Sequence, residues 1–192
     1  MRTAGITGGI GSGKTTVCKI FELLGIPVFY ADEEAKKLYT DSKIKSKTVK
    51  LFGKKILRGK EIDKKKLAQI VFEDKTALKK LNSVIHPAVK AKFNSWKKKQ
   101  KKAAYVIKEA AIMVESGSHK DLDFLISVRA DEQTRIERVS GRDNVPFSEV
   151  EKRLKEQLSD KEREKYADAV IVNDGSRSLI HQVLEIHHKL SE

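Results

Sequence analysis

Residues 8–15 read GGIGSGKT, a complete Gly-x4-Gly-Lys-[Ser/Thr] phosphate-binding loop, or P-loop. The short apolar segment 3–7 before it predicts a buried strand, and the apolar residues of 14–24 after it recur at helical spacing. A second short strand at 26–30 completes a βαβ unit. A dinucleotide fingerprint, Gly-x-Gly-x-x-Gly, fails from Gly9 because its last position falls on Lys14. The stretch therefore predicts a P-loop NTPase fold.

The chemistry of this loop points to a nucleoside triphosphate. Backbone N–H groups of the glycine-rich turn and the positive end of the following helix cradle phosphate oxygens. Lys14 is expected to reach the β- and γ-phosphates, and the Thr15 hydroxyl to bind Mg²⁺. The predicted nucleotide-binding residues in this loop are Gly9, Gly11, Ser12, Gly13, Lys14, Thr15 and Thr16. A kinase and a hydrolase share this loop, so it does not separate them.

Three further apolar runs, at 103–108, 123–128 and 169–172, predict strands. They are continuous rather than alternating, as expected for a parallel sheet with helices on both faces. The sequence therefore predicts a three-layer α/β fold with a five-stranded parallel sheet. Helices are expected at 131–140, after a capping box at 148–151, and around 179–184, the packed face of the last helix.

The segment 32–102 is rich in lysine, is expected to be helical, and shows no convincing strand. Pro87 is expected at the first turn of a helix. We interpret the chain as one P-loop domain, 1–192, whose core is 1–31, 103–137 and 166–192. Residues 32–102 form a helical acceptor-binding insert, and the polar segment 138–165 forms a helical lid that excludes water.

Forty Lys and Arg against 27 Asp and Glu give a net charge of +13. This charge suits either nucleic acid or small, multiply anionic ligands; we favour small ligands and interpret the lysine run at 97–102 as a solvated helix face. No apolar run is long enough to span a bilayer, and the first residues do not resemble a signal peptide. Cys18 is the single cysteine, so we expect a core residue and a cytoplasmic protein. We expect a monomer or weak homo-oligomer that binds neither nucleic acid nor membrane.

Asp32 follows the second strand, at the sheet edge where ligands bind in open parallel sheets. A carboxylate there suits a group that orients a substrate hydroxyl and takes its proton. The alternative is a helix N-cap, because Asp32 opens an acidic segment. Position alone leaves both open.

Several stretches together resemble the dephospho-coenzyme A kinase family. They are 7–16 (TGGIGSGKTT), 25–28 (GIPV), 31–32 (AD), 81–87 (LNSVIHP), 114–115 (VE), the trio Arg138, Arg142 and Asp143, and 167–175 (ADAVIVNDG). The matches cover nearly the whole chain. The helical segment with 81–87 separates this family from other nucleotide kinases, and a GTP-dependent switch protein would need an Asn-Lys-x-Asp motif that the sequence lacks.

The resemblance implies transfer of the ATP γ-phosphate to the ribose 3′-hydroxyl of dephospho-coenzyme A, the last step of coenzyme A synthesis. It implies catalytic roles for Asp32, Lys14 and Arg142. It also implies that ATP contacts Arg138, Arg142, Asn173 and Gly175, and that the acceptor contacts Thr7, Asp32, His86 and Glu115. The family has a second aspartate where this chain has Tyr30.

Three of these assignments have plainer alternatives. Glu109 closes the third strand. In P-loop proteins an acid at this place holds Mg²⁺ through water, and the alternative is that Glu109 is a structural carboxylate. The proline that the family has soon after this position is missing here. Arg138 and Arg142, one helical turn apart, suit a transferring phosphoryl group or surface ion pairs with Glu137 or Glu149. His86 is otherwise a cap or packed core residue.

Overall fold

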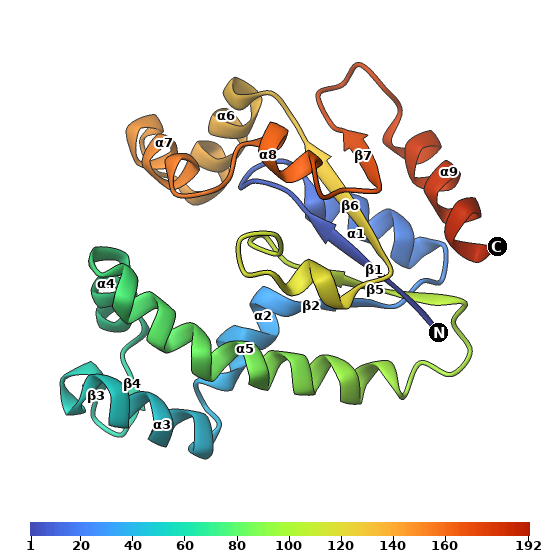
Figure 1. Cartoon of the computed structure of the whole chain (residues 1–192). Coiled ribbons are helices and arrows are strands. Elements are labelled where there is room, and N and C mark those ends of the chain that lie inside the picture. Colours follow the sequence, from blue (N-terminus) through green and yellow to red (C-terminus); the bar gives the residue numbers. More distant parts are fainter. The chain divides into compact units, whose positions relative to one another are not determined.

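The computed structural model describes the backbone of residues 1–192 and every side chain except those of Phe72 and Lys75. The chain divides into two compact units. The first comprises 1–30 and 100–192 and contains the parallel sheet, while the second comprises 31–99 and is mainly helical (Figure 1).

The sheet of the first unit has five parallel strands in the order β2-β5-β1-β6-β7, which confirms the predicted fold class. Each strand begins and ends within two residues of its predicted bounds. The bounds are β1 Arg2–Thr7, β2 Val28–Tyr30, β5 Tyr105–Glu109, β6 Phe124–Arg129 and β7 Ala169–Val172. Because β1 lies at the centre, the loop that follows it emerges in the middle of the carboxyl edge, the usual ligand-binding position in such sheets.

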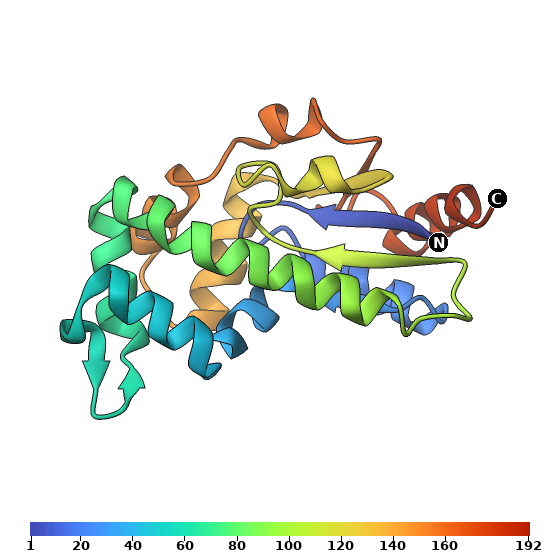
Figure 2. The ribbon, with the colours of Figure 1, turned by 60° about the horizontal axis from the view of Figure 1, so that its bottom comes forward.

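Helices α1 (Lys14–Leu23) and α9 (Leu179–Ser191) cover one face of this sheet (Figure 2). Alternate residues of β1, Ala4 and Ile6, are fully buried in the core that these helices form, and so is Cys18, as predicted. The other face is covered by the connection after β5, which includes the short helix η2 (Ser118–Asp121). A side chain at Gly5 would collide with Met113 and Leu122 of that connection. The three layers thus fix the strands from both sides.

Three helices lie between β6 and β7: α6 (Glu132–Asp143), α7 (Phe147–Lys155) and α8 (Asp160–Glu164). A small core of Ile136, Val139 and Val150 joins α6 to α7. The predicted capping box at 148–151 is wrong, because α7 already begins at Phe147 and its N-cap Pro146 has no side-chain acceptor. The capping box in this region is instead Ser159 with Glu162, at the start of α8.

The second unit consists of helices packed on the long α5 (Lys75–Lys97). The others are α2 (Ala31–Leu38), α3 (Ser42–Phe52), the short η1 (Lys54–Ile56) and α4 (Lys64–Glu73). The expectation of no strand is wrong, because β3 (Leu57–Arg58) and β4 (Glu61–Ile62) form a small hairpin. Gly59, at φ 63°, lies in the turn of this hairpin. The glycine in a short loop is the one feature of the sequence that could have indicated the hairpin.

The helix start predicted at Pro87 is also wrong, since α5 runs through this proline. Buried residues at intervals of four form one stripe along the whole helix: Ala77, Leu81, Ile85, Val89 and Phe93. A proline inside a helix costs about 3 kcal/mol. Burial of this continuous stripe against α2, α3 and α4 offsets that cost.

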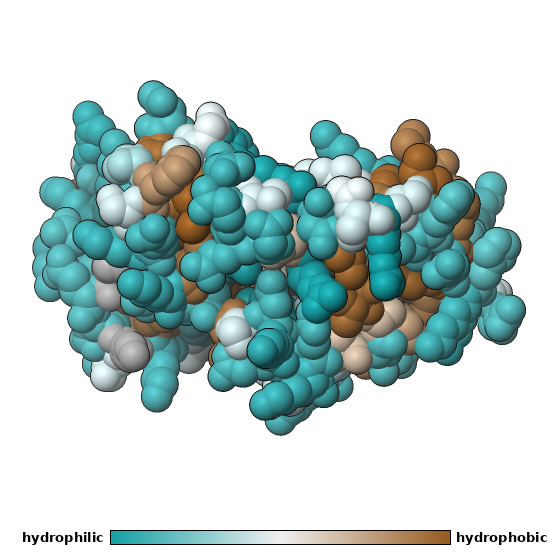
Figure 3. Space-filling model, turned by 90° about the horizontal axis from the view of Figure 1, so that it is seen from above, coloured by the Kyte–Doolittle hydropathy of each residue, from teal (hydrophilic) through white to brown (hydrophobic). Residues whose placement is uncertain are grey.

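The surface seen in Figure 3 is mainly hydrophilic, with hydrophobic residues in patches between polar ones. Among the described residues, no helix combines the length and the apolar character that crossing a bilayer requires.

Candidate active site

The P-loop connects β1 to α1, as predicted, and its lysine folds back over it. Lys14 Nζ donates to the carbonyl oxygens of Gly8, at 2.9 Å, and Gly9, at 3.4 Å. Thr15 and Thr16 are exposed in the first turn of α1. These two residues are therefore accessible at the positive end of the helix.

Other segments approach several glycines of the loop closely, Gly9 and Gly13 among them. Gly13 adopts φ 94°, and a side chain there would collide with the amide of Asn173. That amide donates to the Ser12 carbonyl oxygen at 2.8 Å, so the loop after β7 is bound to the P-loop. Gly175 follows in the same loop, exposed and at φ 87°. A side chain at Gly9 would collide with the guanidinium of Arg135.

Glu109 lies at the carboxyl end of β5, beside the start of the P-loop. It pairs with Ile6 of β1 on one side of β5 and with Tyr30 of β2 on the other side, and it is buried. Burial raises the pKa of the Cys18 thiol, and the charge of Glu109 raises it further. The carboxylate therefore lies close to the start of α1 as well as to the two strands.

Tyr30 occupies the place of the family's earlier aspartate. Burial raises the pKa of its hydroxyl, and so do the Cys18 and Glu22 charges and a hydrogen bond with Glu22. Tyr30 therefore stays neutral at ordinary pH and does not replace a carboxylate as a base.

Two residues expected on the acceptor side already have partners within the first unit. Thr7 is buried at the end of β1, and its hydroxyl donates to the Ala111 carbonyl oxygen at 3.2 Å. Glu115 Oε1 accepts from the Leu158 N–H at 3.2 Å and from Arg163 Nη2 at 3.3 Å. Glu115 thus links the connection after β5 to α8.

The two predicted lid arginines differ in their surroundings. Arg138 is exposed on α6, and its Nη1 lies 3.5 Å from the Gly11 carbonyl oxygen, so the structure brings it to the P-loop. Arg142 instead makes a forked pair with Asp143, at 2.8 and 3.2 Å. That pair raises the pKa of Arg142 and lowers that of Asp143. Its ion-pair partner is therefore Asp143, rather than Glu137 or Glu149, the partners expected for a surface pair.

Asp32 and His86 belong to the second unit. Asp32 lies in the first turn of α2, two residues beyond the end of β2. It is not the N-cap, because the helix already begins at Ala31. His86 lies half-buried in the middle of α5, so the interpretation of it as a cap before a helix is wrong.

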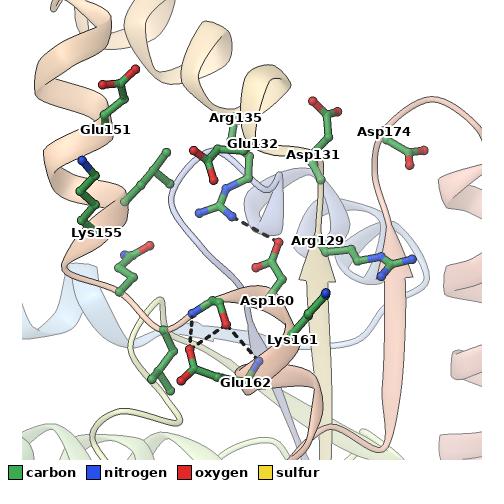
Figure 4. A pocket seen from close by; sticks show the side chains of 15 residues that line it. Arg129, Asp131, Glu132, Arg135, Glu151, Lys155, Asp160, Lys161, Glu162 and Asp174 are labelled. Carbon is green, nitrogen blue, oxygen red and sulfur yellow. Dashed lines mark hydrogen bonds and ion pairs between the residues drawn. The ribbon is translucent and has the colours of Figure 1, made fainter.

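Sequence reasoning missed three charged residues on the outer side of the P-loop: Arg135, Asp160 and Arg163. Arg135 and Asp160 form an ion pair at 3.2 Å, and both line a pocket of about 760 Å³ bordered by α6, α7 and α8 (Figure 4). Gln157, which we expected only as part of a polar lid, accepts from the Ile10 N–H at 2.8 Å. Burial distinguishes Arg135 and Arg163 from most other charged residues of the chain, and a sequence pattern does not show burial.

The family model described as dephospho-CoA kinase matches residues 2–178. The chain belongs to the dephospho-CoA kinase family. A dephospho-CoA kinase of Bacteroides fragilis is 38% identical over 183 residues, covering 95% of this chain and 89% of that protein. The solved structure of TT1252 from Thermus thermophilus superposes with a TM-score of 0.89 at 30% identity, covering 98% of this chain and 96% of that one. A solved dephospho-CoA kinase from Campylobacter jejuni has a TM-score of 0.69 at 29% identity, covering 100% and 98%.

As a member of the dephospho-CoA kinase family, the chain is a phosphotransferase with ATP as co-substrate. This decides between the kinase and the hydrolase that the P-loop alone leaves open. The resemblance inferred from the short motifs is thereby confirmed, since the matching model spans all of them.

Proposed function

We propose that this protein transfers the γ-phosphate of ATP to the ribose 3′-hydroxyl of dephospho-CoA, giving coenzyme A and ADP as the last step of coenzyme A synthesis. The match of the family model across residues 2–178 carries this proposal. The P-loop supports it, because a kinase needs a site that holds a nucleotide by its phosphates.

On the donor side, the P-loop holds the phosphates through Gly9, Gly11, Ser12, Gly13, Thr15 and Thr16. Lys14 exchanges its carbonyl partners, Gly8 and Gly9, for the β- and γ-phosphate oxygens. The loop after β7, with Asn173 and Gly175, lies at the P-loop and is the proposed contact for the rest of the nucleotide.

The residues present fit a magnesium ion. Mg²⁺ prefers oxygen ligands and is bound in kinases through few protein groups together with substrate phosphates. The exposed Thr15 hydroxyl and, through water, the Glu109 carboxylate would supply such oxygens. Among the described residues, no group of three or more His, Cys, Asp or Glu side chains forms a self-sufficient metal site. The bound ion would neutralise charge that develops on the phosphates.

On the acceptor side, Asp32 orients the 3′-hydroxyl and accepts its proton. The 3′-oxygen then forms a bond to the γ-phosphorus, the bond from that phosphorus to the β–γ bridging oxygen breaks, and ADP leaves with the electron pair. Residues 32–102 form the insert that selects the acceptor, with His86 from α5. Thr7 and Glu115 contribute from the first unit; Glu115 uses Oε1 for internal hydrogen bonds.

The segment 138–165 is the proposed lid. Arg138 lies at the P-loop, where it would neutralise charge on the transferring phosphoryl group. Arg142 joins it by exchanging Asp143 for a phosphate oxygen, and this exchange makes closure dependent on substrate. We expect the enzyme to act in the cytoplasm on small molecules, as a monomer or weak homo-oligomer.

A coupled assay of ADP release tests this function. The protein is supplied with MgATP and, in parallel, with dephospho-CoA, AMP, CMP or adenosine as the acceptor. We expect turnover with dephospho-CoA at least about tenfold above the others, because the pantetheine side of the acceptor adds binding contacts that the smaller molecules lack. Activity on a nucleoside monophosphate but not on dephospho-CoA would overturn the proposal.

A further inference from the structure

Arg163 of α8 is fully buried, which is unusual for a guanidinium. Its Nη1 donates to Asp160 Oδ1 at 2.8 Å, and its Nη2 donates to the Leu158 carbonyl oxygen at 2.8 Å and to Glu115 Oε1 at 3.3 Å. A buried charge persists only when it is paired and hydrogen-bonded. Arg163 therefore holds Asp160 in one orientation.

Asp160, held in this orientation, also binds a second buried arginine, Arg135. Asp160 Oδ1 accepts from Arg163, and Asp160 Oδ2 accepts from Arg135 Nη1 at 3.2 Å. Figure 4 shows the contact between Asp160 and Arg135. Arg135 in turn donates from Nε to the Ile10 carbonyl oxygen at 3.0 Å. A chain of charge-assisted hydrogen bonds thus runs from Glu115 through α8 and α6 to the P-loop, within the first unit.

At the P-loop, both backbone groups of Ile10 are held from outside. Arg135 binds its carbonyl oxygen, and Gln157 Oε1 accepts its N–H at 2.8 Å. The guanidinium of Arg135 also fills the space beside Gly9, and the backbone of Arg135 lies where a side chain at Gly11 would be. The turn is therefore fixed on its outer side.

This contact has a geometric consequence for phosphate binding. The Ile10 carbonyl and the Gly11 N–H belong to one planar trans peptide unit, so they point in opposite directions. When Arg135 binds the carbonyl on the outer side, the Gly11 N–H is turned toward the inner side of the loop. That is the side on which P-loop amides receive phosphate oxygens.

We propose that Arg135 is a positioning residue that sets the Gly9–Gly11 turn for the phosphates of ATP, and that Asp160 and Arg163 act through it. This inference rests on the proposed function for its account of turnover, but its nucleotide-binding part stands on the P-loop alone. None of the three residues needs to touch ATP. The effect of Arg135 falls on the donor, because Arg135 holds the loop that binds it. Arg163 also contacts Glu115, which we propose for the acceptor side, so Arg163 itself is not varied in the test.

The test uses Arg135→Gln, Asp160→Asn and the double variant in the full-length protein. Lys161→Gln is the matched control, since it removes one charge from the same helix and the same cavity. Calorimetric titration with MgATP gives the dissociation constant, and steady-state kinetics gives KM for ATP and for dephospho-CoA separately. Asp160→Asn preserves the side-chain shape and serves as the second probe should Arg135→Gln unfold.

We expect Arg135→Gln to raise both the dissociation constant and the KM for ATP about tenfold or more, as loss of a charge-assisted hydrogen bond does. Asp160→Asn should raise them severalfold, and the double variant should match Arg135→Gln alone, because Asp160 acts through Arg135. For Arg135→Gln the KM for dephospho-CoA should stay within about twofold of wild type, and so should all values for Lys161→Gln. A purely structural role would not produce this difference between the two KM values.

Wild-type affinity for ATP in folded Arg135→Gln or Asp160→Asn would overturn the inference, and so would multiplicative effects in the double variant. These results differ from failure of the proposed function. In that case the wild-type protein binds MgATP but does not phosphorylate dephospho-CoA, and the titrations still decide the role of Arg135.

Discussion

The two units of this protein differ sharply in how they use charge. Residues 31–99 carry 21 Lys and Arg against 8 Asp and Glu, a net +13, whereas the rest of the chain carries 19 of each. All of the excess charge thus lies in the unit that we propose for the acceptor. The unit with the P-loop is balanced, and it buries two of its arginines in ion pairs.

The difference shows that the net charge of a unit and the roles of its individual charged residues are separate properties in this protein. In the P-loop unit, a few arginines have fixed partners and set backbone geometry. In the second unit, many lysines produce one broad positive potential. Such a potential attracts multiply anionic ligands, such as the pyrophosphate of dephospho-CoA, and it also strains the unit by self-repulsion.

The largest effect on stability should come from Arg163→Met in the first unit. This change removes the buried cation that Glu115 shares with Asp160, and only Asp160 keeps a second one, Arg135. Breaking a buried pair costs about 3–5 kcal/mol. The free energy of unfolding, measured by urea denaturation, gives the value.

The control for that change lies in the other unit. Lys92→Met removes the 3.2 Å pair with Glu34, whose partners are partly exposed, and should cost less than about 1 kcal/mol. Equal losses for the two variants would remove the contrast between fixed and diffuse charge.

A smaller effect should follow from salt. Raising NaCl from 0.01 to 0.5 M shortens the Debye length from about 30 Å to below about 10 Å and screens the lysines of the second unit. We expect amide hydrogen exchange in α5 to slow about fivefold, equivalent to about 1 kcal/mol, while exchange in β1 and β5 changes little. A uniform change across both units would show that the charge asymmetry does not affect stability.

The sequence was most informative where one pattern specifies one structure. The P-loop and the continuous apolar runs predicted the parallel sheet, because a strand that is buried on both faces needs apolar residues at nearly every position. The family followed from short motifs spread over the chain, and the comparisons confirm it.

The errors occur where two patterns are equivalent locally. The pattern Ser-x-x-acid occurs at 148–151 and at 159–162, but only the second is a capping box, because Pro146 and the packing of Val150 on α6 start α7 earlier. Pro87 also fits a helix start. Burial of one stripe along α5 decides otherwise, and this tertiary effect is not visible in a short window.

The charged residues behind the P-loop could not be predicted for a related reason. Arg135, Asp160 and Arg163 come from two helices separated in sequence, and the two arginines are set apart by their burial. The chain has 40 Lys and Arg, and composition does not indicate which of them are enclosed.

The central claim is that the first unit holds ATP while Asp32, from the second unit, activates the acceptor. Asp32→Asn tests it most directly, with MgATP affinity and turnover on dephospho-CoA measured on the same sample and Glu33→Gln as the neighbouring-carboxylate control. The account predicts an ATP dissociation constant within about twofold of wild type and a kcat lower by about 10²–10⁴, the contribution of a general base. Unchanged turnover, or loss of ATP binding together with turnover, would contradict it.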